Sequence, residues 1–255
     1  MALKDKTQRF GTTEKSDPSF HLDIFDRLYE GNLIITKRLS DEMIDKLIEN
    51  KEKCILHMTC TGLNTLEPVI PLKEITLTQI NKLIEKGFPV NQIVLRVDPI
   101  IPTEKGTNTA LSVISLFKDT GISRVRISFL DMYYHVRKRF SENNIKNPYP
   151  SEYFHAPEEM RISAYQKIKE VCDEYNMKLE MCGEIPIEIN GEKIETTPCL
   201  SQTDVDILGL TDKITLVEKT KERIFCGCPE NKTDLILGKP QQCPHKCLYC
   251  FWKNK

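Results

Sequence analysis

The sequence predicts an α/β protein whose main part is a partial (β/α)6 barrel. Short apolar segments alternate with amphipathic helical segments from Phe20 onward, as they do in βαβ units with a parallel sheet. At least five such strands fall within residues 33–182, whereas a full eightfold barrel typically needs about 250 residues. Polar residues also recur where these strands end. An open doubly wound sheet is the alternative fold.

Each predicted strand is a short run of β-branched and other apolar residues. In chain order the runs are Leu33–Thr36, Cys54–Thr59, Ile93–Val97, Val125–Leu130 and Lys178–Cys182. The predicted helices space their apolar residues at a helical period. They cover Phe20–Tyr29, Asp41–Glu49, Leu77–Lys86, Asn108–Thr120 and Pro157–Tyr175. Gly87 and Gly121 mark two helix ends, because glycine favours the position just after a helix.

The alternation of helices and strands stops after Gly183, which divides the chain into two predicted regions. Residues 1–183 form the partial barrel, and residues 184–255 form an irregular, cysteine-rich, metal-binding segment packed on the barrel rim. Asn190-Gly191 predicts a hairpin turn near the start of that segment, since this pair suits the backbone of a two-residue turn.

Charge and hydropathy argue against two classes of protein. The 36 basic and 37 acidic side chains nearly cancel, so bulk positive charge does not predict a nucleic-acid binder. No apolar stretch approaches the ~20 residues that cross a bilayer, and residues 1–16 are polar rather than signal-like. We therefore expect a cytoplasmic protein that has no membrane partner.

The ten cysteines are concentrated in the final third of the chain. In a reducing compartment, thiols stay free and bind metals. Cys54, Cys60 and Cys172 lie earlier, in strand-like or helical contexts that predict buried apolar roles. The other seven are candidate metal ligands: Cys182, Cys199, Cys226, Cys228, Cys243, Cys247 and Cys250.

Cys243, Cys247 and Cys250 form a C-x3-C-x2-C motif, with Tyr249 directly before the third cysteine. Three thiolates at that spacing can hold three irons of a [4Fe-4S] cube and leave the fourth iron open to a ligand that is not protein. An open iron suggests chemistry, whereas a fourth thiolate would suggest an electron carrier or a structural site. A Cys3His zinc site that also uses His245 is the alternative.

Parallel α/β folds place their ligands at the carboxyl ends of their strands. The residues at those ends here are charged, hydroxylic or thiol-bearing. They are Thr36-Lys37-Arg38, Thr59-Cys60-Thr61-Gly62, Arg96-Val97-Asp98-Pro99, Ser128 to Asp131 and Cys182-Gly183-Glu184. Together they predict a binding site along one rim, although a single polar strand end is equally explained by contact with solvent.

Several segments between about Phe10 and Trp252 carry a resemblance to a known family. They are Ile35-Thr36-Lys37, Met58 to Gly62, Leu66-Glu67-Pro68, Arg96 to Ile100, Ile127 to Tyr133, Cys226-Gly227-Cys228 and the terminal cysteine motif. With them the chain resembles an uncharacterised family of radical-SAM-like proteins, known as a domain of unknown function, whose cysteine motif is C-terminal. It is also distantly similar to spore photoproduct lyase and the DNA repair photolyases among radical S-adenosylmethionine (SAM) enzymes.

The resemblance implies that Cys243, Cys247 and Cys250 bind a catalytic [4Fe-4S] cluster and that SAM chelates its open iron. Such an enzyme reductively cleaves SAM to a 5′-deoxyadenosyl radical, which abstracts hydrogen from a substrate. It takes its electron from a donor such as flavodoxin or ferredoxin. The photolyase-like branch implies a nucleobase or nucleic acid as substrate, while the near-zero net charge favours a smaller molecule.

The resemblance also implies roles for polar residues at the strand ends. Lys37 matches a lysine that pairs with the SAM carboxylate, a natural partner for an anion. Thr59 and Thr61 are then placed for the ribose or amino group of SAM. Arg96 and Asp98 lie farther round the rim, near SAM or substrate.

Tyr133 begins a segment, ending at Arg139, that joins aromatic side chains to positive charge after a strand end. Such a loop can contact phosphates or bases, and Tyr133 is a candidate catalytic residue that could donate a hydrogen atom. A solvated helix start and ordinary packing are the structural alternatives.

One feature departs from the family pattern. A typical member carries its cysteine loop after the first strand and a Gly-Gly-Glu-like turn after the second. Here residues 9–17 contain no cysteine, and Thr36-Lys37-Arg38 stands where the glycine turn would. Because chain termini are often close in space, the C-terminal segment could lay its cysteines over the same rim.

Cys182, Cys199, Cys226 and Cys228 match the number of thiolates that closes a zinc site or fully ligates an auxiliary iron-sulfur cluster. The close C-x-C pair favours the cluster over zinc, and independent buried thiols are a third interpretation. The alternative for the whole chain is a non-catalytic barrel with a zinc-stabilised tail that binds nucleic acid or a protein partner.

Overall fold

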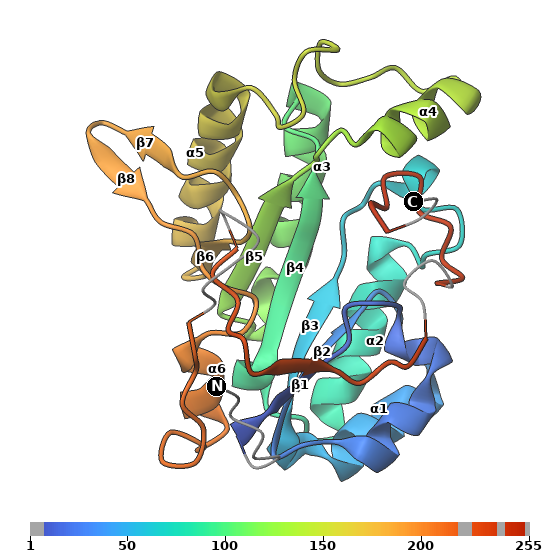
Figure 1. Cartoon of the computed structure of the whole chain (residues 1–255), viewed down its shortest axis with the longest axis vertical. Helices are drawn as coiled ribbons and strands as arrows, with labels where there is room; N and C mark the ends of the chain where they lie inside the picture. Colours follow the sequence, from blue (N-terminus) through green and yellow to red (C-terminus); the bar gives the residue numbers. More distant parts are fainter. Residues whose placement is uncertain (1–7, 219–225, 239–242, 253–255) are drawn as a thin grey trace.

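The main sheet has seven parallel strands in the order β6-β5-β4-β3-β2-β1-β9 (Figure 1). The computed structural model describes residues 8–218, 226–238 and 243–252. The strands of this sheet are β1 (Phe10–Thr12), β2 (Gly31–Thr36), β3 (Cys54–Thr59), β4 (Ile93–Ile100), β5 (Arg124–Phe129), β6 (Lys178–Met181) and β9 (Lys232–Asp234). The predicted α/β class with a parallel sheet is confirmed.

From β1 to β6 each strand lies next to its neighbour in sequence, and every pairing is parallel. Right-handed crossovers between adjacent parallel strands place their connecting helices on one face. This strand order has no reversal point, in contrast to the doubly wound alternative. The sheet is open, and among the described strands β6 and β9 are its edges.

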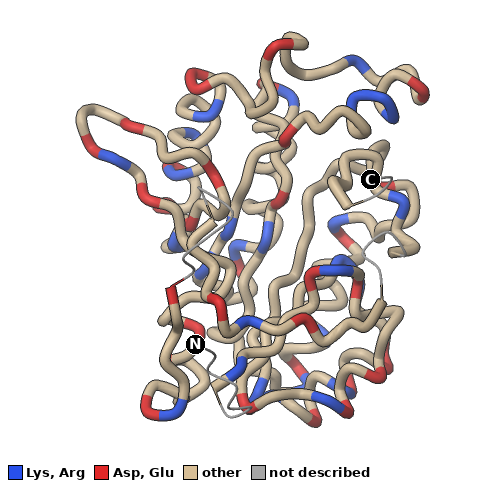
Figure 2. The backbone as a smooth tube through the Cα atoms, in the orientation of Figure 1, with Lys and Arg blue, Asp and Glu red and all other residues tan. Residues whose placement is uncertain are grey.

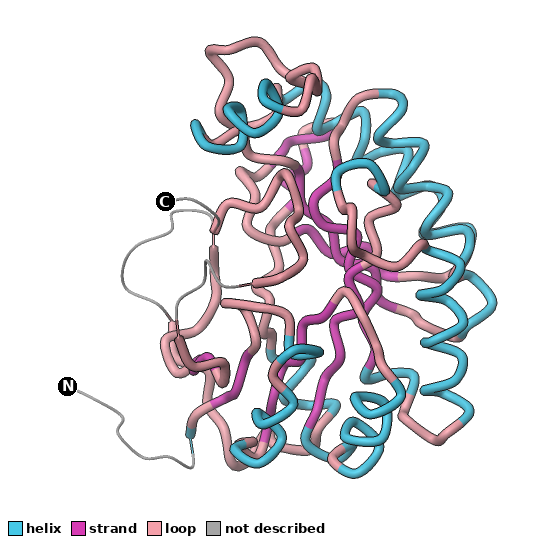
Figure 3. Tube along the Cα trace, turned by 90° about the vertical axis from the view of Figure 1, so that its right-hand side faces the viewer, coloured by secondary structure: helices cyan, strands magenta, loops and turns pink. Residues whose placement is uncertain are grey.

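Four helices pack on one face of the sheet, and Figure 3 shows helices gathered on that side. They are α1 (Asp41–Glu49), α2 (Lys73–Glu85), α3 (Glu104–Leu116) and α5 (Glu158–Glu174). α1 begins after Ser40, whose side chain accepts a hydrogen bond from the Met43 amide. Its apolar side chains join strand residues such as Leu56 and Leu95 in the main core. Cys54, Cys60 and Cys172 are buried in this core, as predicted.

The opposite face, which we call the inner face, is covered by the part of the chain that follows β6. Successive strand side chains point to opposite faces, so Leu33, Ile55 and Val94 face inward beside residues that enter the main core. They pack there with Val205 of α6 (Gln202–Ile207) and with Leu210. The same alternation brings the polar residues at the strand ends to this face.

Most predicted elements exist, with shifted bounds. β3 and α1 have the predicted bounds, and the Asn190-Gly191 turn joins β7 (Ile187–Ile189) to β8 (Glu192–Ile194) as an antiparallel hairpin. The predicted helix Phe20–Tyr29 is wrong. Two 3-10 turns, η2 (Pro18–Phe20) and η3 (Leu22–Arg27), stand there, because Asp17 caps a turn that starts at Pro18.

The region after Gly183 contributes to the main sheet, because β9 pairs in parallel with β1. The two predicted regions therefore share one sheet, and the boundary at residue 183 stays a prediction. Basic and acidic residues are mixed along the chain (Figure 2). Within the described residues, no helix combines the length and apolar character needed to cross a membrane.

Candidate functional site

Residues 243–252, which we call the terminal cysteine loop, lie at the carboxyl ends of β2 and β3 (Figure 1). The Leu248 amide donates a hydrogen bond of 2.9 Å to the Leu66 carbonyl, in the segment after β3. Arg139 of α4 (Tyr134–Glu142) donates from Nε to the Leu248 carbonyl over 2.8 Å and from a terminal nitrogen to the Cys250 carbonyl. The loop thus reaches the rim on which the strand ends meet.

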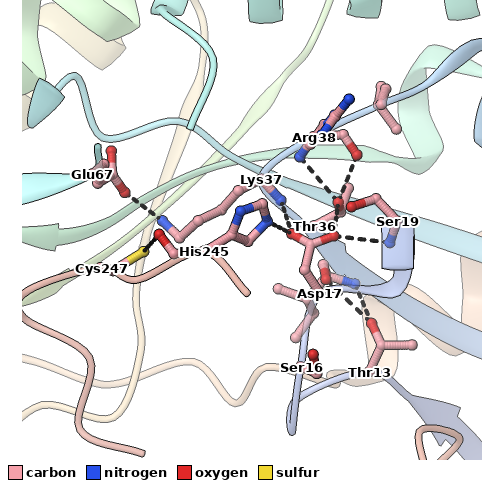
Figure 4. A network of polar contacts seen from close by, with 12 residues as sticks. Thr13, Ser16, Asp17, Ser19, Thr36, Lys37, Arg38, Glu67, His245 and Cys247 are labelled. Carbon is pink, nitrogen blue, oxygen red and sulfur yellow. Dashed lines mark hydrogen bonds and ion pairs between the residues drawn. The ribbon is translucent and has the colours of Figure 1, made fainter. Parts of the chain in front are cut away.

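Lys37, directly after β2, links this loop to the sheet. Its Nζ lies 2.8 Å from Oε1 of Glu67 and 2.8 Å from the Tyr249 hydroxyl. The Tyr249 hydroxyl also donates to Glu67, and Oγ1 of Thr61 donates to the second carboxylate oxygen over 2.5 Å. We call these four residues the Lys37 network; Figure 4 shows the Lys37–Glu67 contact.

The mutual attraction of Lys37 and Glu67 keeps both side chains charged despite their burial. Burial lowers the pKa of Lys37, but the charges of Glu67 and Cys247 outweigh it, so the pKa lies above its usual value. Burial likewise raises the pKa of Glu67, and the charge of Lys37 more than reverses that effect. Burial raises the pKa of Cys247 to about 11, although Lys37 acts in the opposite direction. The site therefore places an ammonium group beside a buried thiol.

A second contact holds the terminal cysteine loop through Asp17. Nε2 of His245 lies 2.8 Å from Oδ2 of Asp17, which also accepts from the Lys37 amide over 2.7 Å (Figure 4). Burial raises the pKa of Asp17, but the hydrogen bond and charge of His245 help to bring it below the usual value. Because Nε2 of His245 faces Asp17, this nitrogen is not oriented to complete the alternative Cys3His zinc site.

We expect that Tyr249→Phe loosens the terminal cysteine loop, because it removes the hydroxyl that contacts both Lys37 and Glu67. Losing hydrogen bonds to charged groups should make local opening about tenfold more frequent. Trypsin cleavage after Lys246, followed by mass spectrometry, measures this opening. Tyr153→Phe, at an exposed tyrosine, is the control. Equal cleavage rates in both variants and the wild type would show that the hydroxyl does not hold the loop.

The three motif cysteines lie close enough to influence one another, since the charges of Cys243 and Cys250 contribute to the raised pKa of Cys247. Cys247 is buried, and the other two are half-buried. Within the described ranges, no three His, Cys, Asp or Glu side chains are grouped to hold one metal ion. Thiolates on three separate irons of a cube lie farther apart than thiolates on one ion. The ligands of a [4Fe-4S] cluster therefore need larger sulfur–sulfur distances than the ligands of a single metal ion.

Arg96, Asp98 and Thr59 lie on the inner face, near the ends of β3 and β4. Nε of Arg96 donates to Oδ2 of Asp98 over 2.6 Å, and the Ser128 hydroxyl donates to the other carboxylate oxygen. The charge of Asp98 also contributes to the raised pKa of Lys37. The structure therefore brings the predicted binding residues of β2, β3 and β4 to the rim formed by the carboxyl ends of these strands.

The structure also brings together Cys182, Cys199, Cys226 and Cys228, here called the four-cysteine group. The sulfurs of Cys182 and Cys199 are 3.1 Å apart, and the free thiol of Cys228 lies within hydrogen-bond reach of the thiols of Cys199 and Cys226. Two sulfurs on a tetrahedral ion with ~2.3 Å bonds lie about 3.8 Å apart, so the first pair is closer than two ligands of one ion. Nη1 of Arg96 contacts the Cys199 sulfur over 3.4 Å.

Tyr133 lies beside the terminal cysteine loop. Its ring stacks on Phe251 with centroids 5.9 Å apart and meets Phe154 edge-on at 4.8 Å. His135, the second residue of α4, contacts the Phe251 carbonyl through Nε2 over 2.9 Å. These contacts match the packing alternative, and a role for Tyr133 as hydrogen donor stays a prediction.

No role was predicted for Asp17 or Glu67, and Arg139 was predicted only as part of a segment that could contact phosphates or bases, although each of the three holds the site together. Glu67 belongs to a segment that carries the family resemblance, and an acid just after a strand end was the available signal. Asp17 precedes Pro18, a pattern typical of a capped turn rather than of a binding site. Only the tertiary fold shows that these carboxylates face Lys37 and His245.

Comparisons with known proteins give one family and no named relative. No curated protein matches the chain, and no solved structure matches it. A family model described as "Domain of unknown function (DUF1848)" matches residues 31–252, which include Lys37 and all seven candidate cysteines. That description names no activity, so the radical-SAM-like and photolyase-like relationships stay predictions. As the sequence led us to expect, the chain belongs to an uncharacterised family, DUF1848.

Proposed function

We propose that this protein is a radical SAM enzyme whose [4Fe-4S] cluster is held by Cys243, Cys247 and Cys250. The observation that carries the proposal is the position of the terminal cysteine loop. It packs at the carboxyl ends of β2 and β3, where parallel α/β folds bind their ligands, and beside the ammonium group of Lys37. This is the arrangement that a cluster with one open iron and an anionic ligand requires.

The donor set suits an iron-sulfur cluster. Three cysteines at the C-x3-C-x2-C spacing supply thiolates, and metal binding displaces their protons even where burial raises the pKa, as at Cys247. The guanidinium group of Arg139 donates to the main-chain carbonyls of Leu248 and Cys250, so the loop is anchored without using the sulfurs.

In this proposal, Lys37 binds the carboxylate of SAM. Its side chain is 18 % exposed, and an ammonium group has three donors, of which Glu67 and Tyr249 engage two. Thr59 would contact the ribose or amino group of SAM. Thr61 already donates to Glu67, so we assign it to orienting that carboxylate.

When bound, the cluster and SAM would supply the 5′-deoxyadenosyl radical that abstracts hydrogen from the substrate. The chain itself would position the reactants and exclude water. Arg96 and Asp98, which form an ion pair with each other, would line the binding site next to Lys37 and Thr59. A one-electron donor such as flavodoxin or ferredoxin would be the redox partner.

We infer further that β1 to β6 form a partial (β/α)6 barrel. Three observations support this: the strands follow sequence order, the long helices share one face, and the polar strand ends face inward. Segments after β6 cover the inner face, where a closed barrel would have its remaining strands.

For the four-cysteine group, we propose an auxiliary iron-sulfur cluster, with zinc as the alternative. Hydrogen bonds from Cys182 and Cys228, together with the charge of Arg96, bring the pKa of Cys199 well below its usual value. A thiolate is the form that binds metal. The four thiols therefore lie together in surroundings that favour at least one thiolate.

The proposal is tested with protein purified without oxygen and reconstituted with iron and sulfide. The protein should be brown, contain acid-labile sulfide, and release 5′-deoxyadenosine from SAM under a strong reductant. A confirmed cluster without any release would refute the enzyme assignment. A colourless protein containing stoichiometric zinc would support the non-catalytic alternative.

We expect Lys37→Gln to weaken SAM binding about tenfold or more, because one charge-assisted hydrogen bond is lost. The amide can still donate to Glu67, so the iron content should stay unchanged. Equilibrium dialysis of SAM against the reconstituted protein measures the affinity. Lys46→Gln, on the exposed side of α1, is the matched control. An unchanged affinity in Lys37→Gln would remove Lys37 from the SAM site.

A further inference from the structure

A polar cavity of about 620 Å³, which we call the lysine pocket, lies beside the segment that follows β3. Its wall comes from that segment, from the first residue of α2 and from the first turns of α3. The lining residues are Gly62, Asn64, Lys73, Glu104, Lys105, Asn108, Thr109 and Ser112. Because α2 follows β3 and α3 follows β4, the pocket lies at the edge of the sheet where parallel α/β folds bind their ligands.

Contacts within the chain give the lysine pocket a defined shape. Gly62 has a φ of 69°, and a Cβ added there would lie 2.9 Å from Cγ2 of Thr109. Glycine therefore lets the segment after β3 approach α3 closely. The ammonium group of Lys73 donates to the Ser112 hydroxyl, and this contact joins the start of α2 to α3 at the pocket. The wall is thus arranged before any ligand arrives.

Hydrogen-bond donors dominate the lining. Lys105 is exposed, and among the described residues no side chain pairs with its ammonium group. The ammonium group of Lys73 has three donors, of which Ser112 engages one. The side-chain amides of Asn64 and Asn108 add further donors. Two lysines against one glutamate leave the lining with one more positive than negative charge.

These groups favour a phosphate group over other ligands. Two ammonium groups repel a cation, and Glu104, the one acidic residue in the described lining, is too little to hold a divalent metal ion. A phosphate group presents three strong acceptor oxygens and a negative charge. Lysine is a common partner for phosphate, and the neighbouring amides can donate to the remaining oxygens.

The size of the cavity and the position of Glu104 indicate what the phosphate is attached to. Small-molecule sites typically measure about 300–1,000 Å³, and the lysine pocket falls in this range, with room for more than a phosphate ion. The Glu104 carboxylate can accept hydrogen bonds from hydroxyl groups, but it repels a second phosphate. A nucleic-acid strand carries a phosphate on every nucleotide, so the lining fits a small ligand better.

We propose that the lysine pocket binds a small phosphate monoester that carries hydroxyl groups, such as a sugar phosphate. Lys73 and Lys105 bind the phosphate, the two asparagines donate to it, and Glu104 accepts from the hydroxyl groups. The pocket uses none of the residues assigned to the cluster or to SAM. This binding therefore requires neither iron nor SAM, and it can be tested without them.

The test uses the full-length protein as purified and four probes. Ribose 5-phosphate represents the proposed ligand, ribose lacks the phosphate, n-propyl phosphate lacks the hydroxyl groups, and single-stranded oligothymidylate represents a nucleic-acid strand. Saturation-transfer NMR measures the binding of the three small probes. We expect ribose 5-phosphate to bind about tenfold more tightly than ribose or n-propyl phosphate, because each of these lacks at least one charge-assisted hydrogen bond. Oligothymidylate should not displace it.

Three variants locate the binding. Lys73→Gln and Lys105→Gln each remove one charge-assisted hydrogen bond and should weaken the binding of ribose 5-phosphate about tenfold. Asn108→Asp keeps the side-chain shape and adds a negative charge, so it should weaken binding at least as much. Lys167→Gln, at an exposed position of α5, is the matched control and should bind as the wild type does. Circular dichroism confirms that each variant is folded.

Lys37→Gln separates the lysine pocket from the proposed SAM site and should leave the binding of ribose 5-phosphate unchanged. Loss of binding in Lys37→Gln, with wild-type binding in the three pocket variants, would place the phosphate at the SAM site and overturn the proposal. Equally tight binding of ribose, or displacement by oligothymidylate, would also overturn it. Binding of ribose 5-phosphate without release of 5′-deoxyadenosine from SAM would leave the lysine pocket standing and remove only the radical chemistry.

Discussion

Replacing Cys243, Cys247 and Cys250 together by alanine should abolish the release of 5′-deoxyadenosine from SAM. The proposed cluster has no other protein ligands, so removing its thiolates removes its iron. If the four-cysteine group holds a second four-iron cluster, the variant should retain about half of the iron, and otherwise none. Iron analysis and product chromatography on the reconstituted variant measure both effects.

The control for this variant replaces Cys54 and Cys172, two cysteines buried in the main core. It should keep the full iron content and activity, with only a modest loss of stability from the missing sulfurs. If the triple variant kept its full iron content and still cleaved SAM, the terminal cysteine loop would not be the cluster site.

Glu180→Ala should destabilise the fold by about 3–5 kcal/mol, because it leaves the buried Arg126 without its counter-charge. Glu180 of β6 accepts from Arg126 over 3.0 Å and from Arg124 over 3.3 Å, and Arg126 is fully buried. Arg126 also donates to the Cys199 carbonyl, so these side chains hold the four-cysteine group to the inner face. Urea unfolding followed by circular dichroism measures the loss.

The same ion pairs predict how stability depends on pH. Burial raises the pKa of Glu180, but the charges of Arg126 and Arg124 outweigh it, so the folded-state pKa lies below the unfolded value. The stabilisation is present above the unfolded pKa and is lost as the pH falls through the lowered one. Glu180→Ala should therefore lose less stability on acidification than the wild type. Glu188→Ala, at an exposed position of β7, is the control, and a loss below about 1 kcal/mol in Glu180→Ala would contradict the prediction.

The fold was predictable where a segment was long enough to show a period. β3 and α1 have six and nine residues, and their apolar patterns gave the correct bounds. β1 and β9 have three residues each, too few for any alternation, and they pair with each other only because the chain returns to the sheet edge. α4 escaped prediction because its sequence is mostly polar, with Val136 and Phe140 as its main buried apolar residues.

The candidate site was predictable only in its local motifs. Cysteine spacing gave the candidate metal ligands, and the strand-end rule gave Lys37 and Asp98 as candidate binding residues. The partners of these residues come from distant segments, and a single sequence does not show which ones meet.

The contact between Lys37 and Tyr249 joins residues 212 positions apart, and this separation bears on how the protein matures. At about 5–20 residues per second, a ribosome adds the cysteine motif on the order of ten seconds or more after β2 has been made. The helices and first six strands can associate in that interval, before any motif sulfur exists. Under the proposed function, insertion of the cluster at the terminal cysteine loop would therefore be a late event that acts on a nearly finished fold, and termination before residue 243 would yield a product without this cluster.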